Sequence, residues 1–247
     1  MEAKKDIVVV ITALIIVLLV YFCVSFIKSK NYDIENNLIV DETYELKDII
    51  IKSNASNINI KESTNEVIKV KIYGDESRTT IEDYDKLKIE SNIREFKFFN
   101  VNKAASIEIE IPENFDNKIT IDGDYSKINI GNYAKAIFDI DVDAGKIIIG
   151  NASELKLDVN ASDVRISKVN RKLDIEVDAG NVEIEELNLL ENSKIIVDAG
   201  NVEIGNTNKI NINAKVELGQ VDVKNSYSDS EVTLDIKVDL GNISVKN

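Results

Sequence analysis

The side chains of this 247-residue chain that could do chemistry are mostly acidic, and some recur at regular spacing. A carboxylate stands two positions before a small residue at Asp124, Asp143, Asp178, Asp198, Glu217 and Asp239, and Asn160 takes that place once. Stacked at the strand spacing of ~5 Å, such carboxylates would repel, and Ca²⁺ could relieve them with oxygen ligands. The calcium candidates are Asp143, Asp178, Asp198 and Asp239.

The simpler interpretation of these acids is structural. An Asp side chain can bond the backbone two residues on and so stabilise a tight corner. The chain also lacks the glycine-rich nonapeptide of calcium-binding β-rolls. We therefore prefer a corner role to a calcium site and expect no other cofactor.

Composition excludes many reaction classes. The chain has no His and only one Cys, Cys23, which excludes imidazole bases, a disulfide framework and thiolate zinc sites. With 30 basic and 44 acidic residues the net charge is −14, which argues against binding nucleic-acid phosphates. The cluster Glu183, Glu185 and Glu186 is typical of a solvated strand face rather than a hydrolytic pair. We therefore predict that the protein is not an enzyme.

One aromatic cluster could bind a partner. Phe96, Phe98 and Phe99 form the densest group of aromatic residues outside the N-terminal apolar segment. They would either be an exposed binding patch or pack as a strand on the rest of the domain. We prefer the second interpretation.

The elements that position the acids form a repeat. Clear copies are VDAGKIII (142–149), VNASDVRI (159–166) and VDAGNVEI (177–184 and 197–204); a distant one is SNASNINI (53–60). The spacing of about 19 residues is the mark of a stacked repeat architecture. The predicted structural corner residues are Ser126, Gly145, Ser162, Gly180, Gly200, Gly219 and Gly241.

Alternating apolar residues within each copy predict half-buried strands. So short a unit cannot bury its own apolar face, and stacking supplies partners above and below. The sequence therefore predicts an all-β protein with a β-solenoid or β-helix-like stack of rungs, although a two-sheet sandwich of hairpins is an alternative. One inward valine ladder is expected: Val142, Val159, Val177, Val197, Val216 and Val238. The last rung, 241–247, would leave an open edge, through which an end-to-end homopolymer could form.

The predicted organisation has five parts. A short tail (1–6) precedes a transmembrane helix (7–27), a linker or stem (28–45), an irregular β cap layer (46–112) and the solenoid repeats (113–247). The uncharged run Ile7–Ile27 has 21 residues and is about 31 Å long as a helix, enough to span a bilayer. A cleaved signal peptide is the alternative, but its apolar core would be shorter. We expect an uncleaved single-pass anchor with the large C-terminal domain outside the cytoplasm.

An apolar N-terminal segment, a strand ending in IEIEIPENF (107–115) and recurrent DAGNVEI units resemble the bacterial putative-adhesin family of β-strand repeat proteins. The resemblance covers about residues 45–247 and brings no catalytic residues with it. It implies a domain of unknown function at the cell envelope of a Gram-positive bacterium, in some members linked to envelope stress. We expect a non-catalytic, adhesin-like binding module whose partner is a cell-wall or surface polymer or a membrane protein. The alternatives are a regulatory or sensory partner in a stress response and a self-assembling scaffold; the oligomeric state is not predicted.

Overall fold

The computed structural model describes residues 37–74, 76–91 and 105–246. They belong to one compact unit, Ile34–Asn247. The predicted membrane segment 7–27 and the aromatic cluster Phe96–Phe99 lie outside the described residues. Within the part that is described, no helix has the length and apolar character needed to span a membrane.

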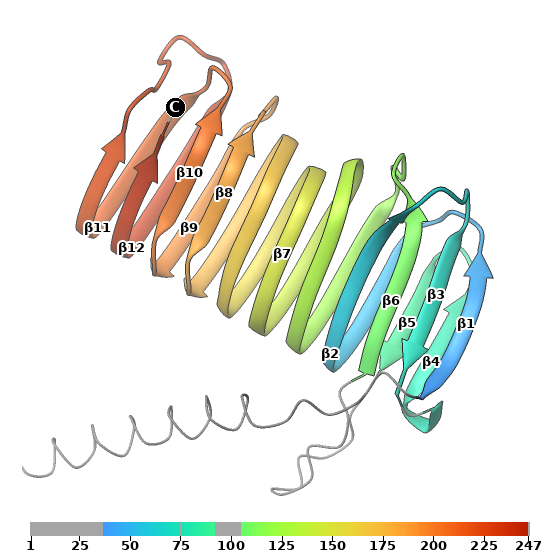
Figure 1. Ribbon diagram of the computed structural model, residues 1–247. Coiled ribbons are helices and arrows are strands. Elements are labelled where there is room, and N and C mark those ends of the chain that lie inside the picture. Colours follow the sequence, from blue (N-terminus) through green and yellow to red (C-terminus); the bar gives the residue numbers. More distant parts are fainter. Residues whose placement is uncertain (1–36, 75, 92–104, 247) are drawn as a thin grey trace, which may run out of the picture. The chain divides into compact units, whose positions relative to one another are not determined.

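The described chain is almost entirely β-strand (Figure 1). One short 3₁₀ helix, η2, spans Glu76–Arg78. The strands are β1 (Leu38–Tyr44), β2 (Ile49–Ser63), β3 (Ile68–Tyr73), β4 (Thr79–Asp83), β5 (Leu87–Ser91), β6 (Ala105–Pro112), β7 (Lys118–Ala179), β8 (Val182–Leu187), β9 (Ser193–Ala199), β10 (Val202–Thr207), β11 (Asn211–Val223) and β12 (Thr233–Val245).

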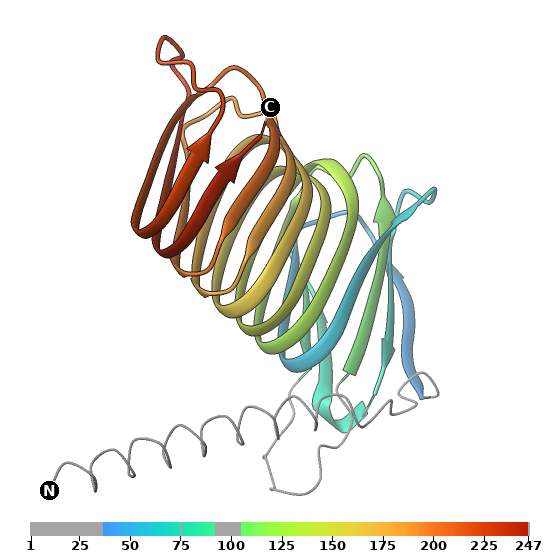
Figure 2. The same ribbon diagram turned by 60° about the vertical axis from the view of Figure 1, so that its left-hand side comes forward.

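The repeats form a stack of parallel rungs, each made of two strand segments joined at a corner (Figures 1 and 2). The 62-residue β7 winds through several rungs, whereas later rungs are split into separate strands. Register is kept from copy to copy: Ile175 of β7 pairs with Ile195 of β9, and Val182 of β8 pairs with Val202 of β10. The predicted β-solenoid-like fold is confirmed, and the parallel register excludes a sandwich of hairpins.

The valine ladder was predicted correctly in its middle part. Val177 pairs with Val197, and both are at most 1% exposed because the rungs on either side cover them. The predicted order is wrong at the C-terminal end, where Val238 lies between Val197 and Val216. The chain places β11 outermost and then returns through the loop 224–232 to insert β12 between β10 and β11 (Figure 1).

This insertion corrects the predicted open edge. The C-terminal strand β12 is covered on both sides, because it pairs in parallel with β11 and with β9 and β10. The uncovered end of the stack is β11 instead, which is hydrogen-bonded only to β12 among the described strands. Both β11 and β12 fit the repeat pattern, so the sequence offered no means of ordering them.

The N-terminal half contains rungs as well as a cap. Strand β2, with the distant copy SNASNINI, pairs in register with β7, with Ser56 opposite Ser126. Strands β5 and β6 continue the stack beyond β2 in parallel. Parallel rungs therefore begin inside the range 46–112, which was expected to be an irregular cap.

Antiparallel strands close that end. Strand β1 pairs with β3, β3 with β6, and β4 with β5. Strand β1 lies in the segment predicted as a linker, and η2 and β4 lie within the range predicted as an irregular cap layer. Both edge strands carry many polar residues, which conceals their alternation.

Candidate functional site

The corner edge is the surface where successive rungs bend, at the residues before and after each Ser or Gly corner residue. Its backbone requires glycine at several rungs. Gly180 has φ +152°, and a Cβ there would lie 1.9 Å from the Ser162 carbonyl oxygen of the neighbouring rung. Gly145 meets Ser126 in the same way, with 1.8 Å between the added Cβ and the carbonyl oxygen. Glycine therefore permits both the backbone angle and the close stacking.

Serine corners differ from glycine corners. Ser126 and Ser162 are buried, at 0% and 5% exposure, and each lies directly beside a glycine corner of the next rung. Positive φ is found at Gly145, Gly180, Gly200, Gly219 and Gly241 only, among the glycines that the structure describes. The predicted corner residues thus occupy the same position in the rung, but the glycines have a positive φ and the serines do not.

The predicted acidic row follows the corner edge, with its C-terminal order changed by the insertion of β12. Several of its members have local partners: Asn160 donates to the Asp143 carboxylate at 2.8 Å, and Lys237 Nζ lies 2.7 Å from Asp239 Oδ1. Among the described residues no three His, Cys, Asp or Glu side chains are grouped so as to hold a metal ion. Within that part of the chain, none of the four calcium candidates, Asp143, Asp178, Asp198 and Asp239, belongs to such a group.

A second group of carboxylates lies beside the first, around Asp141. Partial burial raises the pKa of Asp141, and the negative charges of Asp158, Asp122 and Asp143 raise it further, while Lys156 opposes them. Four carboxylates, Asp122, Asp141, Asp143 and Asp158, therefore lie within reach of one another's charge on this part of the sheet. The surface beside the corner edge is therefore strongly acidic in the rungs formed by β7.

Sequence reasoning missed an amide ladder on the other side of the corner. The Asn181 side chain donates to Asp163, Asn201 donates to Asn181, and Asn242 donates to Asn201, at 3.1, 2.9 and 3.0 Å. Each side chain bonds the same position of the next rung, so the ladder fixes the register. The signal was present in the sequence, because Asn follows the corner glycine in DAGN and LGN.

The tip of the corner edge is apolar, which sequence reasoning also missed. The position just before the corner residue holds an exposed large side chain at Tyr125, Leu240 and Leu218, at 49%, 52% and 68% exposure. Alanines occupy it in the rungs between: Ala144, Ala161, Ala179 and Ala199. The corner edge therefore presents an apolar ridge with carboxylates on one side. On the other side the C-terminal rungs carry the amides Asn181, Asn201 and Asn242, whereas the β7 rungs carry Lys127, Lys146 and Asp163.

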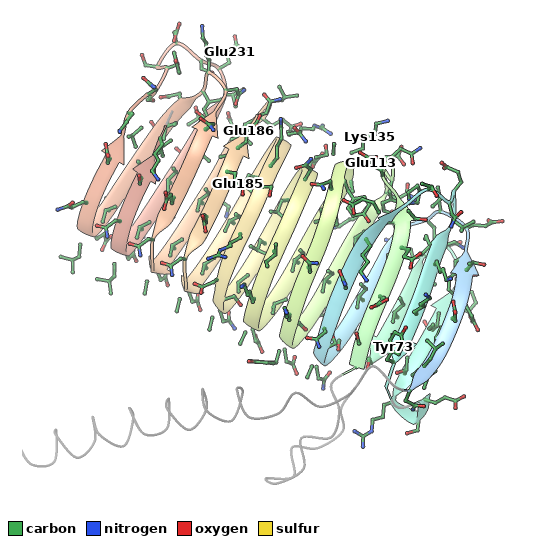
Figure 3. All side chains as sticks on the ribbon, in the orientation of Figure 1. Tyr73, Glu113, Lys135, Glu185, Glu186 and Glu231 are labelled. Carbon is green, nitrogen blue, oxygen red and sulfur yellow. The ribbon has the colours of Figure 1, made fainter. Side chains whose placement is uncertain are left out.

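The carboxylates considered for hydrolysis do not converge. Glu183 pairs with Arg165 at 3.0 Å, and Glu186 pairs with Lys168 at 2.7 Å. Glu185 and Glu186 lie near the edge of the stack opposite the corner edge (Figure 3). Each of the two paired glutamates bonds its own cation on the adjacent rung, as is typical of a solvated face.

One shallow hollow of about 220 Å³ lies on the outer face of the stack, over β7. Charged residues line it, and they are paired with one another: Lys118 Nζ is 2.6 Å from Asp139 Oδ2, and Lys156 Nζ is 3.9 Å from Asp139 Oδ1. Arg171 binds Glu154 nearby at 2.7 Å. These carboxylates are neutralised by cations, so the hollow has no free acid and base aimed at a common point.

Fold and corner pattern together define a toast-rack-like β-repeat protein. The Toastrack DUF4097 family model matches residues 46–247, and the chain belongs to this family. A crystal structure of a "putative adhesin" from Bacteroides fragilis NCTC 9343 has a TM-score of 0.53 at 18% identity and covers 85% of this chain and 97% of its own. The family and the expected resemblance to adhesin-named proteins are thereby confirmed.

Two further crystal structures have lower TM-scores. A "putative adhesin" from Parabacteroides distasonis ATCC 8503 is 10% identical with a TM-score of 0.40, covering 85% of this chain and 98% of its own. A "putative cell adhesion protein" from Clostridium sporogenes ATCC 15579 is 15% identical with a TM-score of 0.33, covering 84% and 98%. No curated protein matches the chain.

Proposed function

We propose that this protein is a non-catalytic binding module of the cell envelope, held at the membrane by residues 7–27 with its β-repeat domain outside the cytoplasm. The observation that carries the proposal is the corner edge, where an apolar ridge runs beside a row of carboxylates. Tyr125, Leu218 and Leu240 are about half or more exposed there. A rigid stack presents such rows at fixed spacing, which suits an extended ligand better than a small molecule.

The chemistry of the corner edge defines the partner. An apolar ridge beside carboxylates suits a ligand that offers apolar and cationic groups along its length, such as a wall polymer bearing amines or a basic segment of a membrane protein. Many charged side chains on the outer faces are already paired with one another. The ridge is therefore the surface that we expect to contact the ligand. The named adhesins among the structural neighbours are consistent with a binding role.

The experiment is crosslinking in living cells. A photo-crosslinking amino acid at Ala161 or Ala179 places the probe on the ridge, and one at Glu186 places it on the opposite edge as the matched control. The expected result is a specific adduct from the ridge positions, identified by mass spectrometry as polymer or protein. Equal labelling from Glu186 would remove the corner edge as the binding surface.

The same cells separate the two leading alternatives. A wall-binding or adhesin-like module should yield a polymer adduct that persists when the membrane segment is exchanged for an unrelated anchor. A regulatory partner in a stress response should yield a membrane-protein adduct that disappears with the exchange. Protease treatment of whole cells tests the orientation, and protection of the β domain in intact cells would contradict it.

A further inference from the structure

The C-terminal end of the stack leaves core positions uncovered. Val238 and Ile243 of β12 are 0% and 1% exposed, because β11 covers them. The equivalent of Ile243 in β11 is Val221, which is 45% exposed. Ala214, Val216 and Val223 of β11 are only partly buried against the core. The apolar interior of the stack therefore ends at an open surface.

Among the described strands only β12 pairs with β11, so the other backbone edge of this segment has no strand partner there. Three backbone N–H groups of this region point toward β12 or the residue before it. Asn211 N–H donates to Val232 O, Gln220 N–H to Asn242 Oδ1, and Lys224 N–H to Val245 O. Backbone groups alternate between the two edges of a strand, so the groups of Ala214, Val216, Val221 and Val223 point to the open edge. Ser226 bonds both backbone groups of Ile212 and thus closes the edge before Ala214.

The open segment 214–223 is complementary to itself in the antiparallel direction. Laid against a second copy, Val216 stands opposite Val221 and Ala214 opposite Val223. All four have free backbone groups and inward side chains, so they form hydrogen-bonded pairs that exchange two bonds each. In the same register Lys215 stands opposite Asp222, which pairs opposite charges on the outer face.

The bend of the rung permits this arrangement. A two-fold axis along the bisector of the β11 corner exchanges its two strand segments, reverses the strand direction and keeps inward side chains inward. We infer that two copies of this chain join tail to tail through β11 and form a closed dimer with one continuous core. The interface is isologous, because each copy supplies the same segment, and therefore it does not extend into a filament.

Directed disulfides test the register. The full chain in detergent micelles, with Cys23→Ser as background, carries Lys215→Cys and Asp222→Cys together. Oxidation should give a covalent dimer, because the two positions are opposite neighbours between copies but lie on different segments of one copy. Lys237→Cys with Ser244→Cys is the matched control, since it places the same pair one rung deeper on β12. Each single cysteine should crosslink poorly, because no residue of β11 lies opposite itself.

Charge exchange tests whether the dimer uses this contact. Lys215→Asp or Asp222→Lys alone puts like charges opposite each other twice per dimer and should weaken association about tenfold in sedimentation at low salt. The double exchange should restore it. A monomer at every concentration, a dimer indifferent to both single changes, or equal crosslinking by the β12 control would overturn the inference; indifference would assign association to another part of the chain.

Discussion

The two ends of the stack differ in the residues that their edge strands place at inward positions. At the N-terminal end, the edge strands β1 and β4 place carboxylates at inward positions: Glu42 stands opposite the buried Val70, and Asp83 opposite the buried Leu87. Tyr44 donates to Glu42 at 2.5 Å, and Lys47 Nζ lies 2.9 Å from Asp83. At the C-terminal end, β11 places valines at those positions. Inward charges on an edge prevent strand addition, and inward valines invite it.

The contrast indicates that the two ends have different roles. An end closed by antiparallel strands and charges needs no partner to complete its core. An end left as an ordinary rung keeps the register, the apolar face and the free backbone that another rung would use. The asymmetry therefore predicts one association surface, at β11, and each experiment below changes one end or compares it with the interior.

The largest effect is expected at an interior corner. Gly180→Ala forces a Cβ to within 1.9 Å of the Ser162 carbonyl oxygen at a positive φ. We expect a loss of about 3 kcal/mol in the free energy of unfolding, because the rungs on both sides hold the corner in place. Denaturant unfolding measures it. Ser162→Ala is the control and should change stability by less than about 1 kcal/mol.

The same substitution at the open end sharpens the comparison. Gly219→Ala would place its Cβ 1.6 Å from the Gly241 carbonyl oxygen, an even shorter approach than at Gly180. We expect a smaller loss in dilute protein, about 1 kcal/mol, because β11 of the monomer has a neighbour on one side only and can move away. Equal losses at Gly219 and Gly180 would show that the C-terminal rung is held as firmly as the interior.

Truncating one valine at each end compares the two cores directly. Val70→Ala in β3 removes a fully buried side chain and should cost about 2–3 kcal/mol. Val216→Ala in β11 should cost about 1 kcal/mol or less in dilute protein, because that side chain is only partly buried. Hydrogen exchange should likewise be faster in β11 than in β3. Similar protection in dilute protein would contradict an open C-terminal end.

Opening the N-terminal end should create a second association surface. Glu42→Val with Asp83→Val replaces both inward charges by apolar side chains. We expect species larger than the dimer, because both ends of each copy then have edge strands without charges at inward positions. Light scattering measures them. Glu185→Val, which makes a comparable change at an exposed position away from both ends, is the control; dimers alone in the double variant would show that another feature protects this end.

Sequence reasoning succeeded where each rung repeats the same local physics. Alternating apolar residues and a small corner residue fix the strand, its inward face and the bend, as Val177 and Gly180 show. The Asn ladder was missed although Asn181, Asn201 and Asn242 hold one place in the repeat, because a single amide carries no sign of its neighbours until the rungs are stacked.

The order of the rungs could not be predicted from the sequence. The segments VELGQVDV (216–223, in β11) and VDLGNISV (238–245, in β12) fit the repeat pattern equally well, so no local feature shows that β12 inserts inside β11. The closing strands were hidden for the opposite reason. Glu42 and Asp83 occupy inward positions, so the charges that protect the edge also interrupt the alternation by which a strand is recognised.

The smallest effect is expected for the crowded carboxylates on the surface of the middle rungs. Burial first, and then Asp158, Asp122 and Asp143, raise the pKa of Asp141 in the folded protein. The folded state therefore keeps a proton that the unfolded state releases, so this group's contribution to stability falls as pH rises through its raised pKa. Asp141→Asn should raise the melting temperature at pH 7 by ~1–2 °C, and the gain should vanish below about pH 4.

Asp139→Asn separates this effect from the net charge. It removes one negative charge as well, but Asp139 pairs with Lys118 at 2.6 Å, so the variant should be slightly less stable than the parent at pH 7. If Asp141→Asn stabilises the protein and Asp139→Asn destabilises it, the charge repulsion is local to Asp141. If both variants gained equally, the cause would be the charge of −14 acting on the whole domain, and local crowding would explain nothing.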